Sequence, residues 1–162
     1  PAAIEKLCGE DTSALPYLGD ALRRYLQQYP SVRNGLNRLQ NAPLKAVATG
    51  PFQLVDIYVQ VDHREDRPFF GDTTLWQCLD GMASGKHPLM FVNGPDRLPL
   101  WNPPRNLAAW EVLVTETGLE VLEGKKDWIQ LSGITRWMGG VHLAKGKPLW
   151  RWDEEEQKLV KQ

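Results

Sequence analysis

The sequence predicts an α+β fold in which N-terminal helices precede a small antiparallel sheet, winged-helix-like in the order of its elements. Three observations support this. Apolar residues recur at helical spacing in the first half, and short runs of β-branched and aromatic residues between turns fill the second. Strands and helices do not alternate as a parallel sheet requires. With 162 residues, the chain has the length of one domain, and we expect a helical part at about 12–86 and a β-rich part at about 88–162.

The first predicted helix lies within residues 12–30. Thr12 or Ser13 is suited to cap it and Pro30 to end it. Its apolar stripe repeats at steps of three and four and consists of Leu15, Leu18, Leu22, Leu26 and Tyr29. Because Leu22 and Leu26 lie at the centre of this stripe, we expect both side chains to be buried core residues.

Three further helices are predicted before residue 86. Residues 35–50 form the second, where Asn37 and Gln40 have the spacing of a capping box and Pro43 should kink or delay the helix. Residues 51–62 suit both a helix and a strand, and we choose a short helix. The fourth helix covers residues 73–84 and is capped by Asp72.

The second half reads as short strands and turns. Strands are expected at residues 88–93 and 108–115, a short helix at 116–124, and only strands and turns from Trp128 onward. The proline-rich stretch 93–106 is too irregular to assign. Residues 141–161 predict a small antiparallel meander in which Trp150 and Trp152 share one face. A two-stranded ribbon is marginal by itself, so we expect this meander to be integral to the domain.

Five strings follow one another along the chain: LPYLGDALRRYLQQYPSVRNGL, FFGDTTLWQCL, VTETGLEVLEGKKDW, GITRWMGGVHL and WRWD. In this order they resemble the C-terminal half of an uncharacterised bacterial family, whose longer members carry an additional N-terminal domain of unknown function. RWMGGVHL and WRWD are the most specific elements, and the resemblance runs from about Leu15 to Asp153. The chain departs from the family pattern at Pro43 and at residues 37–39. The resemblance implies a part of a longer protein and implies no established activity.

Charge and motifs exclude several function classes. The net charge of -1 gives no global attraction to nucleic acid or anionic lipid. Apolar runs are too short to cross a membrane, and acids occupy the N-terminus where a signal peptide would be basic and then apolar, so we expect a cytoplasmic protein with no membrane partner. Cys8 and Cys78 lie outside any CxxC spacing, and His63 outside any metal-ligand spacing. We assign no catalytic residue, no cofactor and no metal.

Two groups of residues remain as candidate binding sites. Residues 21–55 contain basic residues and no acid, which indicates either a patch for an acidic partner or a solvated helical face. Residues 128–153 combine tryptophans with arginines, as interface anchors, stacking platforms and aromatic cores all do. His142 with Asp153 would be the base and orienting acid of an enzyme. The partner-binding candidates are Arg23, Arg24, Arg33, Arg38 and Lys45, and the C-terminal cluster is Arg136, Trp137, His142, Trp150, Arg151, Trp152 and Asp153.

The sequence favours a non-catalytic, winged-helix-like interaction domain that docks on an upstream domain or a protein partner. The alternative is a nucleic-acid-binding module that uses the basic first two helices. The expected recognition helix, residues 71–87, carries Asp72 and Asp80, and its one basic residue, Lys86, lies past its end. We therefore expect generic duplex DNA to bind no tighter than ~10⁻⁴ to 10⁻⁶ M.

Overall fold

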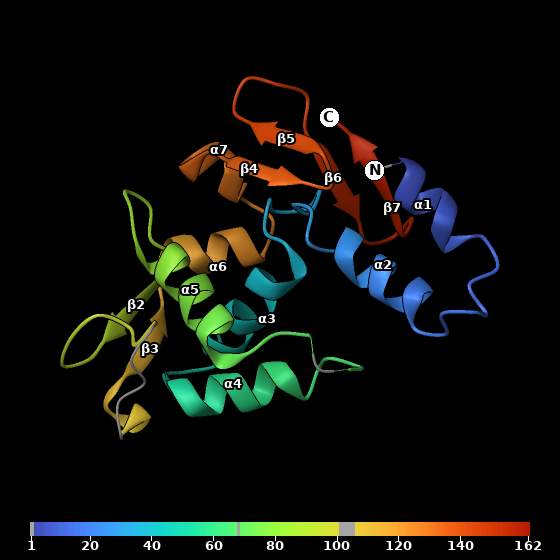
Figure 1. Ribbon diagram of the computed structural model, residues 1–162. Coiled ribbons are helices and arrows are strands. Elements are labelled where there is room, and N and C mark those ends of the chain that lie inside the picture. Colours follow the sequence, from blue (N-terminus) through green and yellow to red (C-terminus); the bar gives the residue numbers. More distant parts are fainter. Residues whose placement is uncertain (1, 68, 101–105) are drawn as a thin grey trace. The chain divides into compact units, whose positions relative to one another are not determined.

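The computed structural model describes residues 2–67, 69–100 and 106–162 (Figure 1). Its helices and small antiparallel sheets confirm the α+β class. The chain divides into two compact units. Unit 1 contains the chain up to Arg38 together with Asp127–Gln162, and unit 2 is Leu39–Lys126. Both units contain helices and strands.

Unit 1 contains three helices and two separate two-stranded antiparallel sheets, β4-β5 and β6-β7. The expected meander is therefore corrected, because β5 does not pair with β6. A helix, α7, stands where only strands and turns were expected, and α1 had not been predicted. The elements are α1 (Ala2–Cys8), α2 (Leu18–Leu26), α7 (Trp128–Ser132), β4 (Thr135–Met138), β5 (Val141–Ala144), β6 (Trp150–Asp153) and β7 (Lys158–Lys161).

Helix α2 begins later than the sequence indicates, at Leu18 instead of near residue 13. Leu26 is buried as predicted, with 3% of its surface exposed. Leu22 is only half-buried, and Leu15 is exposed. The apolar stripe thus reaches the core only at the C-terminal end of the helix, because the residues before Leu18 are not helical and do not continue its packing face.

The core of unit 1 joins α2 and the segment after it to α7 and both sheets. Tyr29 is fully buried, and its hydroxyl donates a hydrogen bond to the carbonyl oxygen of Met138 at 3.2 Å. Strands β6 and β7 contribute Trp152 and Leu159, which supports the prediction that this part of the chain is integral. The buried cluster comprises Leu26, Tyr29, Ile129, Met138, Leu143, Leu149, Trp152 and Leu159.

Unit 2 contains a three-stranded antiparallel sheet in the order β1-β3-β2. The predicted helices and strands of this region are all present, with a two-residue strand before the third predicted helix. Residues 101–105 of the proline-rich stretch lie outside the described residues. The elements are α3 (Arg38–Val47), β1 (Phe52–Gln53), α4 (Leu54–Asp62), α5 (Asp72–Ala83), β2 (Met90–Asn93), the 3₁₀ helix η1 (Leu107–Ala109), β3 (Glu111–Val114) and α6 (Glu116–Leu122).

Helix α3 runs through Pro43, which is buried. Proline has no N–H, so the carbonyl of Leu39, four residues earlier, loses its helical donor. The thiol of Cys78 on α5 donates to that carbonyl oxygen instead, at 3.7 Å. The half-buried cysteine therefore has a structural role, as does the proline that the sequence suggested would interrupt the helix.

Within the three described ranges, no helix combines the length and the apolar character that a bilayer span needs.

Candidate functional site

The exposed aromatic surface of unit 1 lies on the β4-β5 hairpin. Trp137 and His142 are directly opposite each other in the strand register, and their rings are stacked, with centroids 4.7 Å apart and planes 11° apart. Trp137 is 70% exposed, whereas the five other tryptophans that the structure describes are buried or half-buried. We call Trp137 and His142 the aromatic platform.

The hairpin holds this platform on a fixed base. Alternation along the strands puts Trp137 and His142 on one face and Met138 and Leu143 on the other. Met138 and Leu143 belong to the buried cluster, so the inner face is anchored in the core. Residues 139–140, both glycines at positive φ, make the two-residue turn that joins the strands. The hairpin therefore fixes the position of the platform on unit 1.

The segment that contains the hairpin carries basic residues and no acidic ones. No acidic residue occurs between Trp128 and Trp152. The exposed side chains of Arg136, Lys145, Lys147 and Lys161 form no ion pair or hydrogen bond within the described part of the chain. The register places Arg136 on the face of Met138 and Leu143, opposite Trp137. Three other exposed cations of unit 1 do pair with nearby carboxylates: Lys6 with Glu10, Arg23 with Asp20, and Lys158 with Glu156.

Arg151 of the C-terminal cluster lies inside the unit and not on its surface. It is 7% exposed, and its guanidinium makes two contacts with the Asp127 carboxylate and a third with the carbonyl oxygen of Ser31 at 3.1 Å. Trp152 is 5% exposed and belongs to the core, and Trp150 is half-buried against it. Of the seven candidates in this cluster, these three are therefore accounted for by packing and internal pairing.

His142 and Asp153 do not form the pair that an enzyme would need. No hydrogen bond joins them; the Asp153 carboxylate instead accepts from the backbone N–H groups of Glu155 and Glu156, each at 3.0 Å. Asp153 therefore caps the β6-β7 turn. Among the residues that the structure describes, no group of three or more His, Cys, Asp or Glu side chains is arranged to hold a metal ion.

The five basic candidates of the first helices are divided between the two units. Lys45 is exposed in unit 2, and the other four belong to unit 1. Arg23 donates to Asp20 and to the carbonyl oxygen of Cys8, at 3.3 and 3.4 Å. Arg38 donates to the Gln27 side chain at 2.7 Å, Arg24 is half-buried and Arg33 is exposed.

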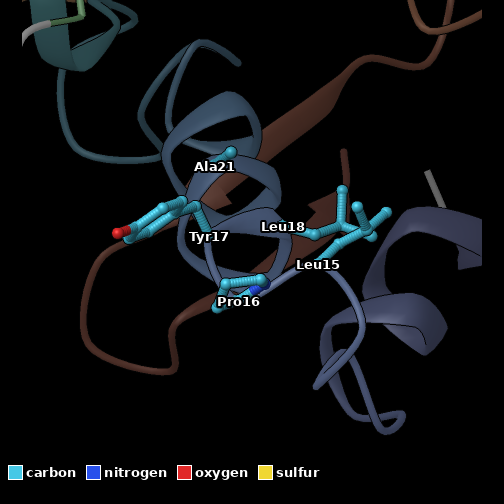
Figure 2. A pocket seen from close by; sticks show the side chains of 5 residues that line it. All are labelled: Leu15, Pro16, Tyr17, Leu18 and Ala21. Carbon is cyan, nitrogen blue, oxygen red and sulfur yellow. The ribbon is translucent and has the colours of Figure 1, made fainter.

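An open apolar hollow lies at the start of α2 (Figure 2). Its volume is about 300 Å³, and Leu15 and Tyr17 on its rim are each at least 60% exposed. The helical spacing of Leu15 and Leu18 predicted buried core positions, so the sequence contained no sign of an exposed hollow at this end of α2. The lining residues are Leu15, Pro16, Tyr17, Leu18 and Ala21.

Comparisons of the chain with protein-family models, with curated proteins and with solved structures find no match. The evidence for function is therefore the geometry of the aromatic platform and its anchoring in the core.

Proposed function

We propose that the chain is a non-catalytic interaction domain that docks onto a protein partner, or onto an upstream domain of its own polypeptide, through the aromatic platform. The observation that carries the proposal is the 70% exposure of Trp137 on a hairpin whose other face is buried. Tryptophan is enriched among the residues that dominate interface energies. Covering the exposed part of the ring would remove on the order of 100 to 170 Å² from water and favour association by about 3 to 4 kcal/mol.

The restricted rotation of the Trp137 side chain should further favour association. A free tryptophan side chain loses rotamer freedom when a partner covers it. The His142 ring already lies against one face of Trp137, which restricts its rotation before binding. The same stacking, together with the absence of a hydrogen bond to Asp153, supports a binding role for His142 over a role as general base.

Unit 2 is winged-helix-like in this proposal. Helix α3, strand β1, helices α4 and α5 and the strands β2 and β3 follow the order helix, strand, helix, helix, hairpin, and the sheet order is β1-β3-β2. Residues 63–71 between α4 and α5 are longer than the tight turn of a simple helix-turn-helix. The exposed residues of α5, the recognition helix of this scheme, are Asp72, Thr74, Gln77 and Gly81. Because the exposed face of α5 has no cation to contact phosphates, it supports protein docking over sequence-specific DNA recognition.

Nucleic-acid binding through the first basic residues receives less support. Arg23 already pairs with the Asp20 carboxylate at the surface of unit 1, Arg38 donates to the Gln27 side chain, and Lys45 belongs to the other unit. Few side chains of this set are then available to neutralise consecutive phosphates.

Site-specific photo-crosslinking in the source cells tests the proposal. A photoreactive residue at Ala144, which shares the face of Trp137, should form an adduct with one protein or with the upstream part of the same polypeptide. The adduct should disappear with Trp137→Ala. A photoreactive residue at Gln130, exposed on α7, is the matched control and should give no such adduct. If the adduct survives Trp137→Ala, the platform is not the docking surface.

A further inference from the structure

We infer that the segment docking on the aromatic platform is an extended strand of a separate protein. It pairs through its main chain with the open edge of β4 and places one planar side chain against Trp137. This inference rests on the proposed function and specifies the conformation and the contact residue of the partner.

The main chain of β4 has an open edge. The backbone N–H of Lys145 donates to the carbonyl oxygen of Ile134 at 3.2 Å, which shows how the hydrogen-bonded pairs alternate along the hairpin. By this alternation, the N–H and C=O groups of Thr135 and Trp137 point away from β5. They have no hydrogen-bond partner within the described residues, and both residues are exposed. These are the groups with which a further strand pairs.

The β6-β7 sheet, in contrast, has both edges engaged. The Trp152 N–H donates to the Pro30 carbonyl oxygen at 2.8 Å, and the Trp152 carbonyl oxygen accepts from the Val32 N–H at 2.9 Å. On β7, the Leu159 N–H donates to the Glu5 carboxylate at 2.7 Å. The side chains of β5 are all buried or half-buried. Because folded proteins usually cover or blunt their strand edges, the accessible edge of β4 indicates a docking site.

The stacking on the platform has the spacing of neighbouring strands. The ring centroids of Trp137 and His142 are 4.7 Å apart, and neighbouring strands of a sheet lie about 4.7 to 4.9 Å apart. Because His142 lies on the β5 side of Trp137, the uncovered face of the indole is turned toward the position of a third strand. A planar side chain of that strand, opposite Trp137, would continue the stack, and such cross-strand pairs stabilise sheets.

A second copy of this chain fits the edge less well than a separate protein does. Two β4 strands that pair antiparallel over Thr135–Trp137 would place Arg136 of one copy opposite Arg136 of the other. This pair would be of the non-hydrogen-bonded kind, in which side chains are closest, and like charges directly opposite each other destabilise a sheet. The edge therefore favours a strand of different sequence.

The crosslink from position 144 tests the inference in the source cells. Thr135→Pro removes one outward N–H, and proline is tolerated at the first residue of an edge strand. Thr135→Val keeps the N–H and differs only by its exposed hydroxyl, so it is the matched control. We expect the adduct to fall about fivefold or more with Thr135→Pro and to stay unchanged with Thr135→Val. Near-ultraviolet circular dichroism identical to that of the wild type shows that both variants are folded.

A peptide test with the full chain decides the same question without the natural partner. The probe is a labelled peptide of about nine residues in which Thr and Val alternate around one central Tyr, and its binding is measured by fluorescence anisotropy. Alternate N–H groups of a strand point to the same edge, so two further peptides carry N-methyl groups on one alternate set of amides or on the other. One set should weaken binding about tenfold or more and the other should be tolerated.

The stacking contact is tested in the same assay. Replacing the central Tyr of the peptide by Ser should weaken binding about tenfold, and so should Trp137→Ala with the original peptide. With Trp137→Ala, the Tyr and Ser peptides should bind equally, because the ring that distinguishes them is gone.

Three results would overturn the inference: an undiminished crosslink in the folded Thr135→Pro variant, the same effect of both methylation patterns, or no binding of the unmethylated peptide. An adduct that joins two copies of this chain, or two parts of one polypeptide, would reject a separate protein as the source of the strand. Failure of the proposed function is seen separately, since the adduct from position 144 then survives Trp137→Ala. An adduct that is lost with Trp137→Ala but persists with Thr135→Pro retains the docking role and rejects the added strand.

Discussion

Asp127 and Arg151 form a buried ion pair in which both guanidinium Nη atoms contact the carboxylate, and only 15% and 8% of the two side chains are exposed. The pair lies where the chain returns to unit 1. Asp127 also accepts from the backbone N–H of Gln130 and so caps α7, while Arg151 bonds to the Ser31 carbonyl. One pair therefore joins α7, β6 and the segment after α2.

Removing the cation alone should destabilise unit 1 strongly. Arg151→Met leaves the Asp127 carboxylate buried without its partner, and we expect a loss of about 3 to 5 kcal/mol in the free energy of unfolding. The double variant Asp127→Asn/Arg151→Met removes the buried charge and keeps a capping side chain, so it should recover more than half of that loss. Denaturant melts measure both values. A loss below ~1 kcal/mol for Arg151→Met would show that the pair contributes little.

Gly35 allows the close approach of Asp127. Its φ is +76°, and a Cβ there would lie 2.9 Å from both Asp127 Oδ1 and the backbone nitrogen of Ile129. Gly35→Ala should therefore cost ~2 to 4 kcal/mol, the sum of left-handed strain and collision. Gly146→Ala is the matched control, since its φ is +79° but nothing lies within 4 Å. It should cost only ~1 kcal/mol. Equal losses in thermal or denaturant melts would show that Asp127 adapts to the new methyl group.

Much of the fold was predictable because its signals are local. Helix α5 and strand β2 carry complete apolar patterns between clear breakers, and both lie where the sequence placed them. Helix α7 was missed, although Asp127 and Gln130 have the spacing of a capping box, because a five-residue helix is too short for periodicity to show. The separation of β5 from β6 depends on packing between distant segments, which no local pattern contains.

The candidate site was only partly predictable for the same reason. Trp137 and Trp152 look alike in the sequence, since both occupy short strands beside an arginine. Which of them is buried depends on the face that each sheet turns to the core. Arg151 is buried because its partners, Asp127 and Ser31, lie 24 and 120 residues away in the chain. Charge counting along the sequence could not distinguish it from the unpaired Arg136.

Tyr29 should make the stability of unit 1 depend on alkaline pH. Burial raises the pKa of its hydroxyl to about 12 from the ordinary value of 10. A raised pKa means that folding favours the protonated phenol, so this stabilisation is complete below pH 10 and is lost as the pH rises toward 12. The effect amounts to ~2 to 3 kcal/mol.

The comparison of wild type with Tyr29→Phe isolates this contribution. The variant loses the hydrogen bond to Met138 and should be less stable at pH 8, by ~1 kcal/mol. Above pH 10 the wild type should lose stability faster than the variant, so that the two profiles of unfolding free energy against pH cross near pH 11 and the wild type is the less stable protein at pH 12. Parallel stability profiles between pH 9 and 12 would contradict the assignment to Tyr29, because other tyrosines and lysines titrate equally in both proteins.

Replacing Trp152 by alanine should reduce stability, whereas replacing Trp137 by alanine should abolish docking and leave stability nearly unchanged. Trp152 is 5% exposed in the core cluster, so Trp152→Ala should cost ~3 to 5 kcal/mol in denaturant melts. Trp137 is 70% exposed, and its replacement removes only the contact with His142, so the loss should stay below ~1 kcal/mol. Docking should show the reverse order, since Trp137→Ala abolishes the crosslink from position 144 in a protein that is still folded. A large loss of stability with Trp137→Ala would mean that the indole is needed for folding, and the exposed ring would then no longer be evidence of a partner.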